Sequence, residues 1–242
     1  MNLIIDVGNT LLKFAVFEAN VLLTKKSCEK KEFLTMLSKI AEAHSEVSHC
    51  IVSSVGEFTK KELSKLEERY PVTVLSNETK VPFTNLYETP KTLGVDRIAL
   101  VSAAAVAYPD RNVLIIDAGS CVTYDFLNDA NEYLGGAISP GLSMRYSALN
   151  NFTAKLPHLE ADTTENLIGN NTASSIHSGV GQGLLYEIDG FIRDYKTNYT
   201  DLTIILTGGD AHFLRDSLKS DIFANSNFLL EGLNFILEHN KD

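Results

Sequence analysis

The sequence predicts a mixed α/β protein made of two related halves, and three observations carry this prediction. The segment LIIDVG at residues 3–8 recurs as LIIDAG at residues 114–119. Each copy is an apolar run that ends in Asp-x-Gly and is followed by an alternating segment, as in a buried strand and its hairpin partner. Segments with helical and strand-like patterns are interspersed along the rest of the chain, which is typical of mixed α/β folds.

The first half shows the order strand, strand, strand, helix, strand, helix, strand. We expect strands at 3–7, 12–17, 21–23, 51–52 and 72–75, and helices at 31–43 and 57–69. Residues 76–92 contain Pro82 and Pro90 and have no sustained period, so we expect an irregular segment there. Residues 98–107 are apolar on nearly every side, which predicts a buried helix.

The second half repeats this plan. We expect strands near 113–117, 121–127, 132–134 and 204–206, and helices after Gly141, at 173–196, near 211–218 and near 228–239. The glycines of 179–183 follow no strand and do not fit G-x-G-x-x-G. They interrupt an apolar helical stripe, where we expect them to permit close packing. No flexible linker separates the halves, so we expect two closely packed lobes, 1–107 and 108–242.

Composition, cysteine use and the lack of a long apolar run favour a cytoplasmic protein. The hydrophobic fraction of 44% is ordinary. A formal net charge of −10 argues against nucleic acid or an anionic membrane as a partner. The three cysteines have no C-x-x-C spacing, which fits a reducing compartment without structural zinc. No apolar run is long enough to span a membrane, and the N-terminus does not resemble a leader peptide.

The first Asp-x-Gly loop is a candidate phosphate site. Gly8 allows a sharp turn and a close approach to phosphate, and Asn9 and Thr10 offer hydrogen bonds. Asp6 at the strand end is a candidate Mg²⁺ ligand, and Lys13 on the returning strand offers a positive charge. A plain hairpin turn with a solvated aspartate is the alternative. The repetition in the second half favours the functional interpretation.

The second loop offers the same chemistry through Asp117, for a cation, and Ser120, for a phosphate. Two such loops facing each other would form a cleft for the phosphates of a nucleotide and their counter-cation. Thr207-Gly208-Gly209-Asp210 follows a further apolar strand, and its paired glycines would let a flat adenine ring lie against backbone. The alternative for this segment is the start of a helix with Asp210 as N-cap.

The segment 94–97 begins the predicted buried helix. An aspartate in a first helical turn is ordinary capping and dipole chemistry. The functional alternative is that Asp96 accepts a proton from a substrate hydroxyl while Arg97 binds an anionic group. The sequence has no G-x-x-x-x-G-K-[ST] loop, no zinc-ligand spacing of histidines and no G-x-S-x-G elbow.

In combination, these motifs resemble the type III pantothenate kinase family of the acetate and sugar kinase/actin superfamily. The resemblance extends over nearly the whole chain and includes 6–10, 94–97, 117–119, 135–141, 171–172, 175–176, 178–179 and 207–210. It implies a duplicated ribonuclease-H-like fold, as in actin-like ATPases. It further implies a homodimer with substrate sites near the subunit boundary.

The resemblance also implies a role for each matching residue. The ATP-binding residues would be Asp6, Val7, Gly8, Asn9, Thr10, Leu11, Leu12, Lys13 and Ser120. Asp96 would be the proton acceptor, and the substrate site would comprise Tyr87, Gly94, Val95, Asp96, Arg97 and Thr172. Asp117 would bind a monovalent cation, K⁺ or NH₄⁺, beside the Mg²⁺ that accompanies ATP. We assign the pantothenate carboxylate to Arg97, because its planar fork suits two oxygens.

The implied activity is ATP-dependent phosphorylation of pantothenate at its 4′-hydroxyl, the first step of coenzyme A biosynthesis. One departure from the family pattern is Ser120-Cys121, where relatives usually have Thr-Ala; we expect an altered nucleotide affinity with activity retained. The alternatives are another small-molecule kinase or phosphatase of the superfamily, and a non-enzymatic actin-like ATP-binding protein. The 94–97 motif argues against the first, and the short chain argues against both.

Overall fold

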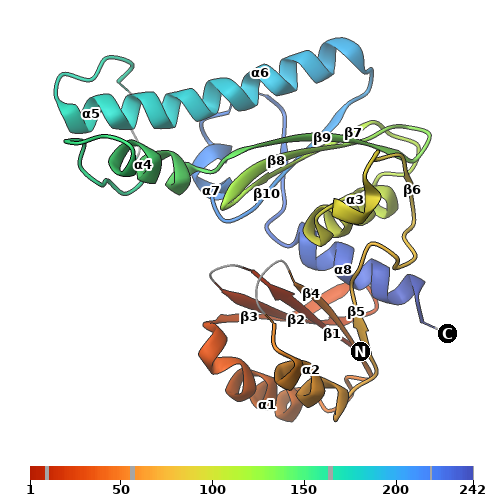
Figure 1. Cartoon of the computed structure of the whole chain (residues 1–242). Helices are drawn as coiled ribbons and strands as arrows, with labels where there is room; N and C mark the ends of the chain where they lie inside the picture. The colour runs from red at the N-terminus through yellow and green to blue at the C-terminus, as the bar shows by residue number, and fades with distance from the viewer. Residues whose placement is uncertain (9–10, 55–57, 163–165, 219, 242) are drawn as a thin grey trace. The chain divides into compact units, whose positions relative to one another are not determined.

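The computed structural model describes residues 1–8, 11–54, 58–162, 166–218 and 220–241. The chain divides into two compact units, each a mixed sheet with helices on its faces (Figure 1). Unit 1 contains Met1–Pro109 and Asn227–Asp242, and unit 2 contains Asp110–Ser226. Among the described residues, no helix combines the length and the apolar character that a membrane span requires.

The sheet of unit 1 has the strand order β3-β2-β1-β4-β5. Its strands are β1 (Asn2–Val7), β2 (Leu12–Glu18), β3 (Val21–Cys28), β4 (His49–Ser54) and β5 (Val72–Val74). The first three form an antiparallel meander, and β4 and β5 continue the sheet in parallel with β1. The predicted strands are thus confirmed, and β3 is longer than its apolar residues indicated.

Helices cover both faces of this sheet. On one face, α1 (Phe33–Ala43), which follows the 3-10 turn η1 (Lys30–Glu32), and α2 (Lys60–Glu67) share a core with alternate residues of the strands. On the other, α3 (Val95–Ala107) packs against α8 (Phe228–His239), and both contact β4. The segment between β5 and α3 contains only β6 (Thr84–Asn85) and the short turn η2 (Pro90–Thr92), as its prolines predicted.

The chain returns to unit 1 at its end. Asn2 on β1 donates a hydrogen bond to Asn234 on α8, with 2.7 Å between Nδ2 and Oδ1, and both residues are buried. Gly232 allows α8 to approach α3, because a Cβ there would lie 1.9 Å from the carbonyl oxygen of Ala99. The predicted division into two consecutive segments, 1–107 and 108–242, leaves α8 in the second half. The packing of α8 in unit 1 depends on contacts between residues far apart in the sequence.

Unit 2 repeats the plan of unit 1. Its strands are β7 (Val113–Ala118), β8 (Cys121–Leu127), β9 (Glu132–Pro140), β10 (Thr203–Thr207) and β11 (Phe223–Ala224). They follow the order β11-β10-β7-β8-β9, with β7, β8 and β9 antiparallel and β10 and β11 parallel to β7. Strands β1 and β7, which carry the repeated sequence, hold the same central position in the two units.

The helices of unit 2 pack on a shared core with β7, β8 and β10. They are α4 (Leu142–Asn151), α5 (Thr172–His177), α6 (Gly183–Asn198) and α7 (Ala211–Arg215). The predicted long helix is continuous from α5 through a π-helical turn, η3 (Ser178–Gln182), into α6 (Figure 1). The expectation that glycines 179, 181 and 183 permit close packing is wrong, because a Cβ at each would meet nothing within 4 Å.

Candidate active site

The first loop follows β1, and Asp6 is the last but one residue of that strand. The Asp6 side chain is buried, and Lys13 on β2 donates to it with 3.3 Å between Nζ and Oδ2. Burial raises the pKa of Asp6 above its ordinary value, the positive charge and hydrogen bond of Lys13 lower it, and the like charge of Asp96 raises it further. Asp96 at the start of α3 therefore lies close to the first loop within unit 1.

The residues around Asp6 divide between backbone and side-chain roles. Val7 and Leu12 are buried in the core, so they can offer a ligand only their backbone groups. The amide of Gly8 donates to the carbonyl of Leu11, 3.1 Å away, and the Leu11 side chain is exposed. Asn9 and Thr10, expected to contact phosphate, lie outside the described residues.

Ser53 is a candidate site residue that the sequence analysis did not identify. It lies on β4 directly beside Asp6 in the parallel register. Its side chain is fully buried, and its Oγ has no hydrogen-bond partner among the residues described. Comparison of the two halves could have identified it, because Thr207 on β10 has the same place beside Asp117.

The second loop, at the end of β7, is enclosed by two close backbone contacts. Gly208 has a φ of +98°, and a Cβ there would lie 2.2 Å from the carbonyl oxygen of Ala118 and 2.5 Å from Oδ1 of Asp117. On another side, a Cβ at Gly141 would lie 2.2 Å from the carbonyl oxygen of Gly119. Oδ1 of the half-buried Asp117 carboxylate and the carbonyl oxygen of Ala118 thus lie against the same face of Gly208. Such oxygen donors suit a hard cation.

Ser120 of the second loop and Gly209, which follows β10, are exposed. Ser120 is exposed beside the turn in which Gly119 donates to the carbonyl of Cys121, 2.9 Å away. A Cβ at Gly209 would meet nothing within 4 Å, so this backbone is open to a flat ligand. Asp210 is the N-cap residue of α7 but makes no side-chain capping bond, and burial raises its pKa.

Five of the six predicted substrate residues lie at the start of α3 or against it. Gly94 is the N-cap residue, and the absence of a Cβ leaves room for the Asp96 carboxylate, whose Oδ1 would otherwise lie 2.4 Å from it. The same Oδ1 accepts a hydrogen bond from the backbone amide of Arg97, 2.9 Å away. The buried Arg97 guanidinium lies 5.5 Å from the ring centroid of Tyr87, a cation–π geometry. Val95, which lies between Gly94 and Asp96 in the sequence, is half-buried.

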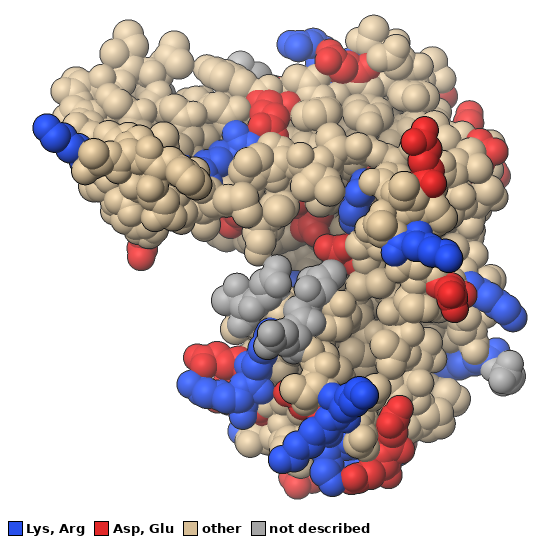
Figure 2. Space-filling model, viewed as in Figure 1, with Lys and Arg blue, Asp and Glu red and all other residues tan. Residues whose placement is uncertain are grey.

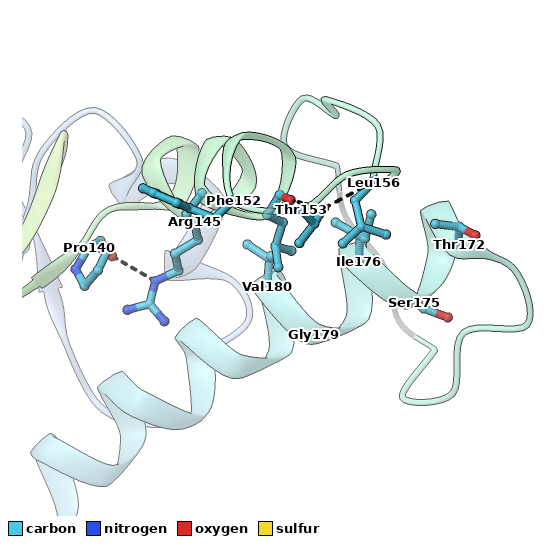
Figure 3. Close-up of a pocket in the computed structure, with 12 residues that line it drawn as sticks. Pro140, Arg145, Phe152, Thr153, Leu156, Thr172, Ser175, Ile176, Gly179 and Val180 are labelled. Atoms are coloured by element: carbon cyan, nitrogen blue, oxygen red, sulfur yellow. Dashed lines mark hydrogen bonds between the residues drawn. The ribbon is translucent and has the colours of Figure 1, made fainter.

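Thr172, the other predicted substrate residue, belongs to unit 2. It is exposed at the start of α5 and lines a pocket of about 950 Å³ between α4 and α5 (Figure 3). Most of the pocket lining is apolar: Pro140, Ala148, Leu149, Phe152, Leu156, Ile176 and Val180. The only fully charged side chain among the described lining residues is Arg145.

Comparisons with known proteins identify the family of the chain. A family model described as type III pantothenate kinase matches residues 2–194. The type III pantothenate kinase of Flavobacterium johnsoniae is 48% identical over 242 residues, covering 100% of this chain and 99% of that protein. The one from Christiangramia forsetii is 50% identical over 241 residues, with coverage of 100% and 99%.

The solved structures bear on the fold alone. A glucokinase from an Antarctic psychrotroph aligns with a TM-score of 0.55 over 99% of both chains, at 13% identity. Sugar kinases of this kind have the actin-like fold, so the predicted fold class is confirmed.

Proposed function

Because the chain belongs to the type III pantothenate kinase family, we propose that Asp96 and the two Asp-x-Gly loops carry out ATP-dependent phosphorylation of pantothenate at its 4′-hydroxyl. This reaction is the first step of coenzyme A biosynthesis. One observation carries the assignment of residues: within unit 1, Asp96 lies close enough to Asp6 for their charges to interact. The proposed base is therefore beside the proposed phosphate loop.

Asp96 takes the proton of the substrate hydroxyl. As the hydroxyl oxygen forms a bond to the γ-phosphorus of ATP, the bond from that phosphorus to the β,γ-bridging oxygen breaks, and ADP leaves. Phosphoryl transfer of this kind demands position and charge stabilisation from the protein. The amide of Arg97 orients Asp96 by donating to its Oδ1. Gly94 leaves the space in which this carboxylate lies.

Arg97 holds the carboxylate of pantothenate. Its planar guanidinium can donate two parallel hydrogen bonds to a carboxylate. The Tyr87 ring lies against the guanidinium and restricts its orientation. Asp96 and Arg97 are consecutive residues of α3, so the first turn of this helix carries both the proposed base and the proposed carboxylate-binding residue.

The ATP phosphates bind to the first loop through Lys13 and the backbone around Gly8. Asp6 is a candidate to bind a cation, because burial disfavours its charge and Lys13 offsets this only in part, so a bound cation would stabilise the carboxylate. When bound, Mg²⁺ neutralises phosphate charge and orients the phosphates. In unit 2, Ser120 contacts ATP, and Asp117 with the neighbouring carbonyl of Ala118 suits a monovalent cation, K⁺ or NH₄⁺.

The homodimer is also part of this proposal. Several apolar side chains of unit 2 are exposed around α4 and α5, and Phe152 and Ile168 are exposed to 87% and 84%. The surface over α4 and α5 carries few charged side chains in Figure 2. Exposed apolar area of this kind marks interaction surfaces. Since Thr172 lines the same pocket, a partner bound there would complete a substrate site near the subunit boundary.

Substitution of Asp96 tests the assignment of the base. The Asp96→Asn variant should lose turnover by about 100-fold or more, because general-base catalysis contributes on that scale. Its affinity for ATP, measured by calorimetric titration, should stay within about 2-fold of the unsubstituted protein. Asp194→Asn, at an exposed position on α6, is the matched control. Near-normal turnover in Asp96→Asn would show that the base is wrongly assigned.

A substrate panel tests the activity itself. ADP release should require pantothenate, with Mg²⁺ and K⁺ present, and should be slower when Na⁺ replaces K⁺. Release with glucose and none with pantothenate would contradict the proposed substrate.

A further inference from the structure

We propose that Arg145 and Glu187 act as positioning residues for the second loop, by holding the backbone on which residues 119–120 rest. This inference rests on the proposed function, which assigns Ser120 to ATP. Neither Arg145 nor Glu187 belongs to any motif that the sequence analysis identified. Their role follows from a chain of contacts within unit 2.

The first step is a pair of hydrogen bonds from Arg145 to the end of β9. From the first turn of α4, its Nε donates to the carbonyl oxygen of Pro140 at 2.8 Å, and its Nη2 donates to Oγ of Ser139 at 2.8 Å. Figure 3 shows the guanidinium reaching back from α4 to Pro140. The side chain thereby fixes two consecutive residues at the junction between β9 and α4.

The second step leads from this junction to the loop. Pro140 lies opposite Cys121 in the register of β9 with β8. The amide of Gly141 donates to the carbonyl oxygen of Ser120 at 3.2 Å, and the glycine packs without a Cβ directly on the backbone of Gly119. With this contact so close, a displacement of 140–141 must displace residues 119–120 as well.

The third step is the anchor provided by Glu187 on α6. Its Oε2 accepts from Nη2 of Arg145 at 2.5 Å, and its Oε1 accepts from the hydroxyl of Tyr124 on β8 at 3.0 Å. The Tyr124 ring is fully buried and stacks on Phe191, with centroids 4.0 Å apart. One carboxylate thus ties α4 and β8 to α6.

Burial makes this ion pair different from the surface pairs of the chain. The side chains of Arg145 and Glu187 are exposed to 20% and 23%, whereas Arg193 and Asp194, also on α6, are exposed to 76% and 74%. A partly buried charge that loses its partner is strongly destabilised. Arg145 without Glu187 would therefore move towards solvent and release Pro140.

The kinetic consequence is specific to the nucleotide. In Glu187→Gln, the KM for ATP and the K⁺ concentration needed for half-maximal activity should both rise by about 10-fold, the scale at which loss of supporting contacts affects ligand sites. The kcat at saturating ATP and K⁺ and the KM for pantothenate should stay within about 2-fold. A merely structural role would lower the amount of active protein without this split.

The experiment compares three variants with the unsubstituted protein. Glu187→Gln removes the charge and one of the two acceptor oxygens of the anchor. Arg145→Lys keeps the charge but replaces the two donor nitrogens, Nε and Nη2, by one. Asp194→Asn is the control on the same helix as Glu187. ATP affinity is measured by calorimetric titration of ATP·Mg²⁺, independently of turnover. Both test variants should weaken it, and the control should not. Arg145→Lys, the milder change, provides the test if Glu187→Gln does not fold.

Two outcomes would overturn the inference. One is unchanged ATP affinity in a folded Glu187→Gln or Arg145→Lys variant. The other is full recovery of ATP affinity in the double variant Arg145→Glu with Glu187→Arg, which restores an ion pair but not the donors to Pro140. Failure of the unsubstituted protein to phosphorylate pantothenate would instead contradict the proposed function, while the titrations with ATP would still test the positioning role.

Discussion

The Asp6 carboxylate lies in surroundings that disfavour its charge, as long as no ligand is bound. Burial is the largest influence on its pKa, and the pairing with Lys13 offsets it only in part. Because the folded protein binds this proton more tightly than the unfolded chain, the stability that depends on Asp6 decreases as the pH rises from 3.8, the ordinary pKa, through the raised value. Above its raised pKa, the charged Asp6 thus destabilises the ligand-free fold.

Asp6→Asn should therefore raise the Tm of the ligand-free protein at pH 8. It removes a buried charge that is only partly stabilised, because the ammonium partner, Lys13, is half exposed. We expect a gain of a few degrees, about 1 kcal/mol or less. The gain should shrink as the pH is lowered towards the ordinary pKa of 3.8, because the folded and unfolded states then differ less in the proton bound by Asp6. Thermal unfolding followed by circular dichroism between pH 4.5 and 8 measures this. A Tm below that of the unsubstituted protein at every pH would contradict it.

Gly208 and Gly209 are neighbours with different constraints. Gly208→Ala should destabilise the protein by about 2 kcal/mol or more, because its φ of +98° and its contact with Ala118 both exclude a Cβ. It should also raise the K⁺ requirement, since the added methyl group would press on Asp117. Gly209→Ala, where a Cβ meets nothing, is the matched control. Equal stability of the two variants in urea unfolding would contradict this explanation.

The sequence predicts the residues of the two loops but not those that hold them. Asp6, Gly8, Asp117 and Gly208 are visible because a strand end and a glycine turn are encoded by adjacent residues. Arg145 and Glu187 are far apart in sequence, and each taken alone is an ordinary polar residue on a helix. Ser53 could not be predicted for the same reason: it becomes a candidate only because β4 places it beside Asp6 of β1.

At the scale of elements, strong periodicity gives reliable predictions and the ends of elements are less certain. Every predicted helix and strand is present, since alternation and helical spacing depend on local sequence. The buried helix begins at Val95, before its apolar run, because Gly94 caps it. The π-helical turn η3 was not predicted, because the apolar stripe continues through it.

The contact between α3 and α8 gives a prediction at this scale. Gly232→Ala should destabilise the protein by about 1–3 kcal/mol, since the methyl group would overlap the carbonyl of Ala99. Gly190→Ala on α6 is the control: its Cβ would meet only the end of Arg193 at 3.9 Å. It should stabilise its helix by about 0.5–1 kcal/mol. Chemical unfolding of both variants measures the difference, and a neutral Gly232→Ala would contradict the packing argument.

At the scale of the whole molecule, the duplication determines where chemistry is placed. Both units have the same strand order around the repeated strand, with the aspartate at its end in each. The sequence predicted this from a repeat of six residues, because only a shared plan explains matched turns at matched strand ends. The helices that differ between the units, above all α4 and α5, could not be predicted from the repeat.

The proposed dimer gives a prediction at this scale. Phe152→Glu should shift the protein towards monomer and raise the KM for pantothenate by about 10-fold, because a charge would replace an 87% exposed ring on the proposed interface. Phe223→Glu, at a ring exposed to 61% on β11, is the matched control and should change neither. Sedimentation velocity of both variants measures the shift. Identical behaviour of the two would contradict an interface around α4 and α5.

The return of α8 to the first unit has a consequence for biosynthesis. Unit 2 is a continuous stretch of chain, so it can fold as soon as it has left the ribosome. Unit 1 emerges earlier but lacks the helix that covers β1, β4 and α3 until residues 227–242 are made. During translation, the N-terminal part of unit 1 therefore has an uncovered apolar surface until α8 is synthesised. Chaperones that recognise such surfaces would bind it in that interval.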